Sequence, residues 1–325
     1  MNISVIGAGS WGTTLARLLA ENGHCINLWA HEKNLAGIIN NKHENTRYLA
    51  GISLPREITA TNSLENAASG AEMIVMAVPS QFLRDVAKEL SSCLKKKIMV
   101  VNVAKGIEKG SCKRMSQVIT EEIPSANVVV LSGPNHSEEV SRKMLTATVI
   151  ASGDKSCLER VKGVFSTKYF KVYPHYDVVG VEICGAIKNI TAIASGVVDG
   201  LGFGDNSKGS IITLGLTEMN RFGRFFGAKQ ATVYGLAGVG DLIATCTSKH
   251  SRNRFVGEKI AEGKHLEDIK KEMHGMVAEG IETTKAVYDF SKKKSIRLPL
   301  TTQVYKVLYE KKELGNAIDD LIKLI

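Results

Sequence analysis

The sequence lacks several features that mark common classes of protein. Its six cysteines form no Cys-x-x-Cys pair and show no metal-ligand spacing, so we expect reduced thiols, a reducing compartment and no metal site. The chain opens with no basic segment followed by an apolar run, and we find no uninterrupted apolar stretch long enough to cross a bilayer. These absences favour a soluble cytoplasmic protein without an integral membrane segment.

Basic residues exceed acidic residues, but they are nowhere concentrated. Lys and Arg number 42 and Asp and Glu 33, for a net charge of +9, which favours anionic ligands. Because no dense basic stretch is interleaved with aromatic residues, nucleic acid is not expected as a partner. A chain of 325 residues with a hydrophobic share of 44% is typical of a soluble protein with two domains.

Residues 1–12 combine an apolar run with a glycine turn. Residues 3–6 favour a buried strand, and Gly7, Gly9 and Gly12 follow with G-x-G-x-x-G spacing before a segment of helical periodicity. The first glycine permits a tight turn, the second lets a pyrophosphate approach the backbone, and the third lets helix and strand pack closely. The order of strand, glycine turn and helix predicts a dinucleotide site rather than a plain glycine-rich turn.

Further apolar runs predict a sheet whose strands alternate with helices. Near-continuous Val, Ile and Met runs are typical of parallel strands covered on both faces. Residues 33–71 are polar and irregular apart from a helix near 34–41. Strands are predicted at 3–6, 25–29, 72–78, 97–103, 127–131, 146–151 and 169–173.

The carboxyl ends of these strands are the expected ligand site, since ligands of parallel sheets bind there. The residues that fall at these ends are Gly9, His31, Pro79, Lys105 and Gly133. The pattern changes near residues 174–177, after which we find helical periods and no convincing strand. The sequence predicts an α/β protein: an N-terminal Rossmann-type, doubly wound, mostly parallel sheet (1–177) and a C-terminal all-helical domain (178–325).

The choice of dinucleotide depends on the residues after the second strand. In this fold an acidic group there meets the adenine ribose and favours NAD over NADP. His31 occupies the position and Glu32 follows it. His31 could stack on adenine or tolerate a 2′-phosphate, Glu32 could accept a hydrogen bond from the ribose, and both could be exposed loop residues. The cofactor is therefore NAD or NADP.

Two residues of the helical part are candidates for proton chemistry. Lys188 lies within an apolar helix, where a desolvated amine is suited to give or take a proton, although it could also extend to the wet edge of the helix. Asp241 follows a glycine-rich stretch at an expected helix start. Its carboxylate could cap that helix, orient a lysine or hold a substrate hydroxyl.

The segment that begins at Ser251 is a candidate anion site. Ser251 is a natural N-cap, and Arg252 and Asn253 follow in the first turn of an expected helix ending near Gly263. A basic residue in a first turn opposes the helix dipole unless an anion offsets it, so phosphate binding is favoured over a plain capped helix. Glu279 lies in a short loop where it could equally be a ligand or a turn residue.

Taken together, these motifs resemble those of the bacterial NAD(P)-dependent glycerol-3-phosphate dehydrogenases. The resemblance implies interconversion of dihydroxyacetone phosphate and sn-glycerol 3-phosphate by hydride transfer with NAD(P)H, supplying glycerol 3-phosphate for phospholipid synthesis, in a homodimer. It covers nearly the whole chain, in order: GAGSWGTTLA at 7–16, AKGIE at 104–108, LSGPNHSEEV at 131–140, EICGAIKNI at 182–190, AGVGDLIATC at 237–246, SRNRFVG at 251–257 and VAEGIET at 277–283.

The resemblance implies roles for the residues that match the family's motifs. Lys188 resembles the catalytic lysine, which protonates the ketone and acts as base in reverse. The family usually has Ser or Thr where this chain has Asn135, and often Ala where it has Ser137. The implied substrate-binding residues are Lys105, Gly133, Asn135, Lys188, Asp241, Ser251, Arg252 and Asn253. The expected cofactor-binding residues are Gly7, Gly9, Ser10, Trp11, Gly12, His31, Lys105, Ser137, Arg252, Val277 and Glu279.

The residues and the resemblance predict the same mechanism. Hydride reaches the carbonyl carbon while Lys188 protonates the growing alkoxide and Lys105 supplies nearby positive charge, in a cleft between the two domains. Binding of the phosphate at residues 251–253 fixes the orientation of the substrate. Two alternatives remain: a related two-domain 3-hydroxyacid dehydrogenase, which has no use for a phosphate site at Ser251, and a non-catalytic dinucleotide sensor in which Lys188 is structural.

Overall fold

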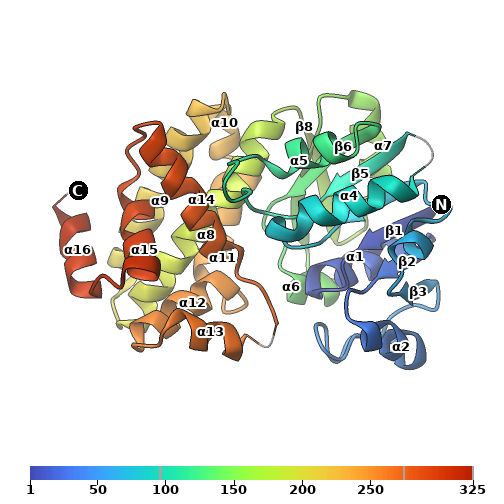
Figure 1. The fold of residues 1–325 in the computed structure, drawn as a ribbon, viewed down its shortest axis with the longest axis horizontal. Coiled ribbons are helices and arrows are strands. Elements are labelled where there is room, and N and C mark those ends of the chain that lie inside the picture. Colours follow the sequence, from blue (N-terminus) through green and yellow to red (C-terminus); the bar gives the residue numbers. More distant parts are fainter. Residues whose placement is uncertain (95–96, 274, 324–325) are drawn as a thin grey trace. The chain divides into compact units, whose positions relative to one another are not determined.

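The computed structural model describes residues 1–94, 97–273 and 275–323. The chain divides into two compact units (Figure 1). The first contains residues 1–104 and 115–178, and the second contains residues 105–114 and 179–325.

The first unit is built on one eight-stranded sheet with the order β3-β2-β1-β4-β5-β6-β7-β8. All neighbouring strands are parallel except β6 and β7, which are antiparallel. This arrangement confirms the predicted doubly wound, mostly parallel sheet. The strands are β1 (Asn2–Ile6), β2 (Cys25–Trp29), β3 (Ile58–Thr61), β4 (Met73–Met76), β5 (Ile98–Asn102), β6 (Ala126–Ser132), β7 (Thr146–Ala151) and β8 (Phe170–His175).

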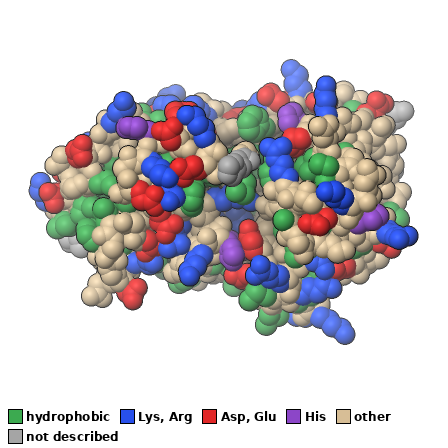
Figure 2. Space-filling view, turned by 90° about the horizontal axis from the view of Figure 1, so that it is seen from below, with side chains coloured by type: hydrophobic (Ala, Val, Ile, Leu, Met, Phe, Trp, Pro, Cys, Tyr) green, Lys and Arg blue, Asp and Glu red, His purple; other side chains and the backbone are tan. Residues whose placement is uncertain are grey.

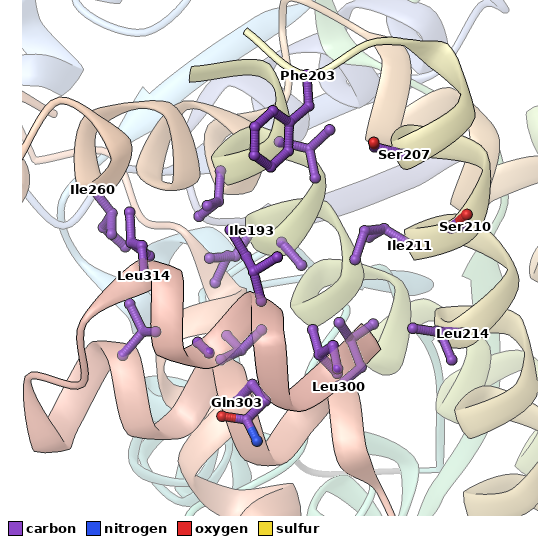
Figure 3. Close-up of a pocket in the computed structure, with 18 of the residues that line it drawn as sticks. Ile193, Phe203, Ser207, Ser210, Ile211, Leu214, Ile260, Leu300, Gln303 and Leu314 are labelled. Carbon is purple, nitrogen blue, oxygen red and sulfur yellow. The ribbon is translucent and has the colours of Figure 1, made fainter. Parts of the chain in front are cut away.

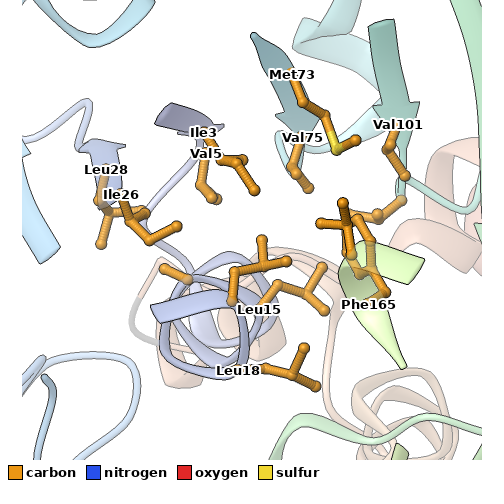
Figure 4. Packing of buried hydrophobic residues seen from close by; sticks show 14 of the residues in the cluster. Ile3, Val5, Leu15, Leu18, Ile26, Leu28, Met73, Val75, Val101 and Phe165 are labelled. Atoms are coloured by element: carbon orange, nitrogen blue, oxygen red, sulfur yellow. The ribbon is translucent and has the colours of Figure 1, made fainter. Parts of the chain in front are cut away.

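Side chains of the central strands alternate between two apolar clusters, because successive residues of a strand point to opposite faces. Val5 of β1 and Val75 of β4 contact the cluster that contains Leu15 and Leu18 of α1 (Figure 4). Ile6 and Ile74 instead join the cluster formed with α3, α4 and α5. Both faces of the sheet are therefore covered by helices, as the apolar runs predicted.

The helices of the first unit follow the strands along the chain. The sequence did not predict β3, a four-residue strand whose burial alternates within a polar stretch. The expected helix near 34–41 is confirmed. The helices are α1 (Ser10–Glu21), α2 (Lys33–Lys42), α3 (Leu64–Ala68), α4 (Leu83–Cys93), α5 (Met115–Glu122), α6 (Ser137–Ser141) and α7 (Lys155–Phe165), with a 3-10 turn at Ser80–Phe82.

The second unit contains no strand among the described residues that belong to it, which confirms the predicted all-helical part. Its central helix is α8, which is buried along most of its length. The helices are α8 (Val178–Gly200), α9 (Asp205–Phe225), α10 (Gln230–Val233), α11 (Asp241–Thr247), α12 (Arg252–Ala261), α13 (Leu266–Glu272), α14 (Glu279–Lys293), α15 (Pro299–Glu310) and α16 (Leu314–Ile322), with a π-helical turn at Leu236–Gly240.

Glycines allow α8 and α12 to pack backbone against backbone. A Cβ at Gly196 would lie 1.9 Å from the carbonyl oxygen of Arg254, and one at Gly257 would lie 2.0 Å from that of Ile193. Neither position tolerates a side chain without a shift of the backbone. The N-terminal turn of α12 is thereby held at a fixed place against α8.

Helix α8 differs from the expectation that no apolar segment of the chain is long enough to cross a bilayer. By length and composition it could cross a membrane, since an 18-residue window has a mean hydropathy of 1.4, whereas we expected no stretch of that kind. Yet 89% of that window is buried inside the protein. The apolar character of α8 is accounted for by its place in the core of the helical unit.

Residues 105–114 pack with the helical unit, although they follow β5 and were expected in the N-terminal domain. Ile107 is fully buried in the apolar cluster of that unit. The guanidinium of Arg114 lies 2.6 Å from the carboxylate of Glu182 on α8, and both side chains are largely buried. The chain therefore leaves the first unit after Ala104 and re-enters it at Met115.

Candidate active site

The glycine turn after β1 has the geometry of a dinucleotide site. Gly7 has a φ of +118°, and a Cβ there would lie 2.6 Å from the carbonyl oxygen of Ala77. A Cβ at Gly12 would lie 1.9 Å from the carbonyl oxygen of Gly7, whereas one at Gly9 would meet nothing within 4 Å. Gly9 is the N-cap of α1 and makes no side-chain cap, and the first turn has no acidic residue. The turn thus offers open space and helix amide groups to a phosphate.

The side chains after β2 form a polar cluster at the expected ribose position. The hydroxyl of Tyr48 donates to the carboxylate of Glu32 at 2.5 Å, and the guanidinium of Arg47 lies 3.8 Å from the same carboxylate. His31 is exposed and meets the ring of Trp29 edge-on, with centroids 5.8 Å apart. Glu32 therefore has partners within the protein, which the sequence alone did not indicate.

Gly133 and Asn135 lie just beyond the end of β6. Gly133 has a φ of +143°, and a Cβ there would meet the backbone of Thr148 at 3.2 Å. The amide nitrogen of Asn135 donates to the hydroxyl of Thr148 at 3.0 Å, and that hydroxyl donates to the carbonyl of Ser132. The Asn135 side chain is thus anchored to β7.

Ser137 and Trp11 lie in the first turns of two helices of the first unit. Ser137 is the first residue of α6, and its carbonyl accepts a long hydrogen bond of 3.5 Å from the hydroxyl of Thr14 on α1. Ser10 precedes Trp11 in the first turn of α1. The indole nitrogen of Trp11 is buried and has no hydrogen-bond partner among the described residues, and its ring lies 6.4 Å from that of Phe170.

In the helical unit, two lysines share one buried carboxylate. The ammonium of Lys188 donates to Oδ1 of Asp241 at 2.7 Å and to the hydroxyl of Thr245 at 2.7 Å. The ammonium of Lys105 donates to Oδ2 of the same aspartate at 3.0 Å. The Asp241 side chain is 2% exposed and that of Lys188 is 6% exposed. Lys188 therefore does not extend to the wet edge of α8.

The pKa values of Lys105 and Asp241 are shifted in this cluster. Burial lowers the pKa of Lys105 to about 7, helped by the neighbouring Lys188 ammonium and opposed by the Asp241 carboxylate. Burial acts to raise the pKa of Asp241, but the two ammonium groups outweigh it and hold that pKa below its usual value. Asp241 is thus an anion beside an amine that can lose its proton near neutral pH.

The side chain of Asp241 does not cap its own helix. The N-cap of α11 is Gly240, with no side-chain cap. Among the interpretations left open by the sequence, the structure favours the one in which the carboxylate orients a lysine.

Amide side chains link this cluster to three helices. The amide nitrogen of Asn189 on α8 donates to the backbone carbonyl of Lys105 at 3.0 Å. Its oxygen accepts from the amide nitrogen of Asn253 on α12 at 2.9 Å. The oxygen of Asn253 in turn accepts from the backbone of Gly280 on α14 at 2.9 Å. Asn253 therefore joins α8, α12 and α14 as well as lying in the expected anion site.

The first turn of α12 has the predicted cap. Ser251 is the N-cap, and its hydroxyl accepts from the backbone of Arg254 at 3.2 Å. No acidic residue lies in this turn, and Arg252 in it is partly exposed. The Arg254 guanidinium instead binds Asp199 at 2.5 Å, so it neutralises a carboxylate of α8.

Val277 and Glu279 lie at the start of α14. Val277 is 36% exposed, and Glu279 is the first residue of the helix after the N-cap Ala278. The described residues contain no group of three or more His, Cys, Asp or Glu side chains arranged to hold a metal ion.

Sequence reasoning missed two members of the lysine cluster. Thr245 lies four residues after Asp241 on the same helix, so the two side chains share a face, and this spacing could have identified it. Asn189 directly follows Lys188, but the backbone group it binds belongs to Lys105. That pairing joins residues 84 positions apart and leaves no local signal.

Comparisons with known proteins agree along the whole chain. Family models described as the N-terminus and the C-terminus of NAD-dependent glycerol-3-phosphate dehydrogenase match residues 2–158 and 177–319. A glycerol-3-phosphate dehydrogenase [NAD(P)+] of Chlorobium limicola is 48% identical, covering 99% of this chain and 97% of the relative. One of Bacillus cereus is 45% identical, covering 98% of this chain and 95% of the relative.

A solved structure has the same fold. The crystal structure of glycerol-3-phosphate dehydrogenase from Coxiella burnetii superimposes with a TM-score of 0.95 at 36% identity, covering 99% of this chain and 98% of that one. Sequence and fold therefore place this chain in the NAD-dependent glycerol-3-phosphate dehydrogenase family.

Proposed function

We propose that this chain interconverts dihydroxyacetone phosphate and sn-glycerol 3-phosphate with NAD(P)H. The observation that carries the proposal is the buried lysine of α8, whose ammonium is held by Asp241 and Thr245. Its relatives carry the name glycerol-3-phosphate dehydrogenase [NAD(P)+]. A ketone reductase needs a proton donor at a fixed position in a site that excludes water, and this cluster supplies one.

We assign the dinucleotide to residues 1–177 and the substrate to residues 178–325, with Lys105 contributed to the latter. The open space at Gly9 and the uncapped first turn of α1 fit a pyrophosphate. When bound, the reduced dinucleotide supplies the hydride. The proposed cofactor contacts are Gly7, Gly9, Ser10, Trp11, Gly12, His31, Lys105, Ser137, Arg252, Val277 and Glu279.

Lys188 is proposed to transfer the proton. As the carbonyl carbon gains a hydride, the oxygen becomes an alkoxide, and the Lys188 ammonium donates a proton to that oxygen. Asp241 holds the amine in position, and Lys105 adds positive charge beside the developing anion. In the reverse direction the neutral Lys188 amine removes the proton from the substrate hydroxyl.

The phosphate of the substrate is proposed to bind at the start of α12. Ser251 and Arg252 lie at the positive end of a helix with no acidic residue in its first turn. Asn253 completes this segment, and the α8–α12 packing fixes its place relative to Lys188. Gly133 and Asn135 are proposed as further substrate contacts. The hydrogen bond from the Asn135 amide to the Thr148 hydroxyl fixes the orientation of the Asn135 side chain.

The proposal also covers the location, oligomeric state and metabolic role of the protein. We infer a cytoplasmic homodimer that supplies glycerol 3-phosphate for phospholipid synthesis, in keeping with the family. The decisive assay follows NADH or NADPH oxidation after addition of dihydroxyacetone phosphate. Turnover of 3-oxoacids with none of dihydroxyacetone phosphate would identify a 3-hydroxyacid dehydrogenase, and dinucleotide binding without any turnover would identify a sensor.

Replacing the proposed proton donor is the sharpest test of the mechanism. Lys188→Ala is expected to lower kcat by about three orders of magnitude or more, since proton transfer at that position is lost, while dinucleotide affinity stays near the wild-type value. Stopped-flow and fluorescence titration measure the two quantities. Wild-type turnover in Lys188→Ala would remove this lysine from the mechanism.

A further inference from the structure

An apolar cavity of about 230 Å³ lies within the helical unit. Its walls come from α8, α9, α12, α15 and α16 and from Phe203 in the loop between α8 and α9, and it contains none of the residues assigned above to substrate or cofactor. Figure 3 shows Ile193 of α8, Ile211 of α9, Leu300 of α15 and Leu314 of α16 directed toward this space. The space is open to solvent on one side, where Phe203 and Ile322 line it, so a ligand can enter it from solution.

The chemistry of the lining selects an apolar ligand. Apart from Ser207, Ser210 and Gln303, the described residues around the cavity are aliphatic or aromatic. The Gln303 oxygen accepts from the ammonium of Lys312 at 2.7 Å, and Figure 3 shows its amide pointing away from the cavity. The Ser210 hydroxyl donates to the carbonyl of Asn206. A sugar, a nucleotide or a phosphate would therefore lose its hydrogen bonds to water there without replacing them.

The size and length of the cavity fit a single hydrocarbon chain. At about 30 Å³ per water-sized group, 230 Å³ accommodates about eight methylene groups. The lining residues of α15 run from Leu300 to Leu308, a rise of about 12 Å at 1.5 Å per residue. Eight groups spread over that length form one extended chain rather than a compact ring system.

Helix α16 supplies one wall with its whole apolar stripe. Leu314, Ala317, Ile318, Leu321 and Ile322 have the spacing of one helix face, and all of them line the cavity. The helix is fixed at its C-terminal end by an ion pair of 2.5 Å between Lys312 and Asp320. Its apolar face borders the cavity, and Ala317 and Leu321 on that face are buried.

The cavity is accessible from solvent at an apolar mouth. Phe203 and Ile322 line it and are 44% and 64% exposed. Figure 2 shows hydrophobic side chains gathered at its left side, the end of the helical unit that carries α15 and α16 in Figure 1. A polar head group could remain outside while the chain enters.

We propose that this cavity binds the hydrocarbon chain of an amphiphile, with about eight carbons enclosed and the head group left in solvent. The proposal does not depend on the proposed function. Ile193, which lies five positions after Lys188 on α8, is part of the lining.

A chain-length series tests the proposal on the full-length protein. The probes are n-alkyl carboxylates and n-alkyl alcohols from four to twelve carbons, titrated by calorimetry below their micelle-forming concentrations. Affinity is expected to rise about fourfold per methylene and to level off near eight carbons, with acids and alcohols of equal length within about threefold. Affinity that is independent of chain length, or no binding by either series, overturns the proposal.

Filling the cavity provides the matched variants. Ala317→Phe places a ring in the cavity and is expected to weaken octanoate and octanol binding at least tenfold, whereas Asn316→Phe on the exposed face of α16 leaves it unchanged. Val304→Phe fills the same space from α15 if Ala317→Phe fails to fold, as judged by circular dichroism and Tm. Equal binding by the filled variants and wild type contradicts the proposal.

The same variants distinguish a second copy of the chain as the occupant. Under our proposal, sedimentation velocity gives the same oligomeric state for wild type, Ala317→Phe and Asn316→Phe. If Ala317→Phe dissociates an oligomer and octanoate does not bind the wild type, the cavity is a subunit interface and the proposal is wrong.

Discussion

The candidate sites of the two units are built from different parts of their residues, backbone in the first and side chains in the second. In the first unit the key positions are glycines, where the absence of a side chain opens the backbone at the end of β1. In the second unit the key positions are charged and amide side chains buried on helices. The backbone site depends on space that a side chain would fill, and the buried site depends on the balance between its ammonium groups and its carboxylate. Substitutions in the first should therefore lower ligand affinity, whereas substitutions in the second should also lower stability.

The largest effect is expected where the charge balance of the helical unit is removed. In Asp241→Asn two buried ammonium groups lose their common carboxylate, so kcat/KM should fall about a thousandfold and unfolding free energy by about 3–5 kcal/mol. Steady-state kinetics and urea unfolding measure both. The control Asp289→Asn removes the carboxylate of an exposed pair with Lys285 and should change neither. An Asp241→Asn variant with normal kinetics would refute the shared-carboxylate arrangement.

A smaller and more selective effect is expected in the backbone site. A Cβ at Gly9 meets nothing within 4 Å, and the residue has a φ of −69°, so Gly9→Ala should fold normally. The added methyl occupies the space proposed for the pyrophosphate, and dinucleotide affinity should fall about 10- to 100-fold. Fluorescence titration and Tm separate the two properties, with Gly37→Ala, an equally uncrowded helix position, as control. Unchanged affinity in Gly9→Ala would place the dinucleotide elsewhere.

The dependence of the reduction rate on pH should also distinguish the two units. Among the described residues, the lysine whose pKa is lowered to about 7 is Lys105, which belongs to the helical unit. Below that pH Lys105 is charged, and above it the charge beside the alkoxide is lost. Ketone reduction should therefore decline above about pH 7. Lys105→Arg keeps its charge at all these pH values and should lose the inflection near pH 7, even if its overall rate is lower. An identical profile in both proteins would assign the inflection to another group.

The last effect is on stability alone and concerns Glu218, a buried carboxylate of the helical unit without a role in the proposed site. It accepts hydrogen bonds from the backbone of Leu300 at 2.5 Å and from the backbone and hydroxyl of Thr301 at 3.0 and 2.6 Å, which cap α15. Burial nevertheless raises its pKa to about 7, from a usual value of 4.5.

The sign of the resulting pH dependence follows from proton linkage. Between pH 4.5 and 7 the folded state retains a proton that the unfolded state releases, so the free energy of unfolding should fall as pH rises, by up to about 3 kcal/mol. Urea unfolding at pH 5 and pH 7.5 measures this. Glu218→Gln removes the ionisation, and the difference between the two pH values should shrink by that amount. An undiminished difference in Glu218→Gln would assign the dependence to other groups.

Most strands of the sheet could be predicted from the sequence, because each of them is encoded by a local run of apolar residues. Apolar runs identified β1, β2 and β4 to β8, and glycine spacing identified the turn after β1. The strand β3 was missed since only alternate residues of Ile58–Thr61 are buried, which leaves no continuous apolar run.

The candidate site was less predictable, because it depends on contacts between distant residues. Lys188, Asp241 and Ser251 stood out through their local surroundings and Lys105 through its place at the end of a predicted strand, and the family resemblance added its role in substrate binding. Nothing local indicated that Lys105 packs with the helical unit, or that Asn189 binds its backbone. The partnership of Glu32 with Tyr48 likewise joins side chains 16 positions apart through a loop whose conformation the sequence does not specify.

The excursion of residues 105–114 means that the two units cannot be exchanged as independent modules. The polypeptide crosses between them after Ala104, again after Arg114 and finally after Val178. A fragment ending at residue 177 would retain Lys105 and Arg114 without Asp241 and Glu182, and would expose Ile107 to water. The helical unit is thus completed by a segment that the chain supplies from between the strands of the first unit, so recombination of such enzymes at a single junction near residue 177 would take Lys105 from one parent and its Asp241 partner from the other.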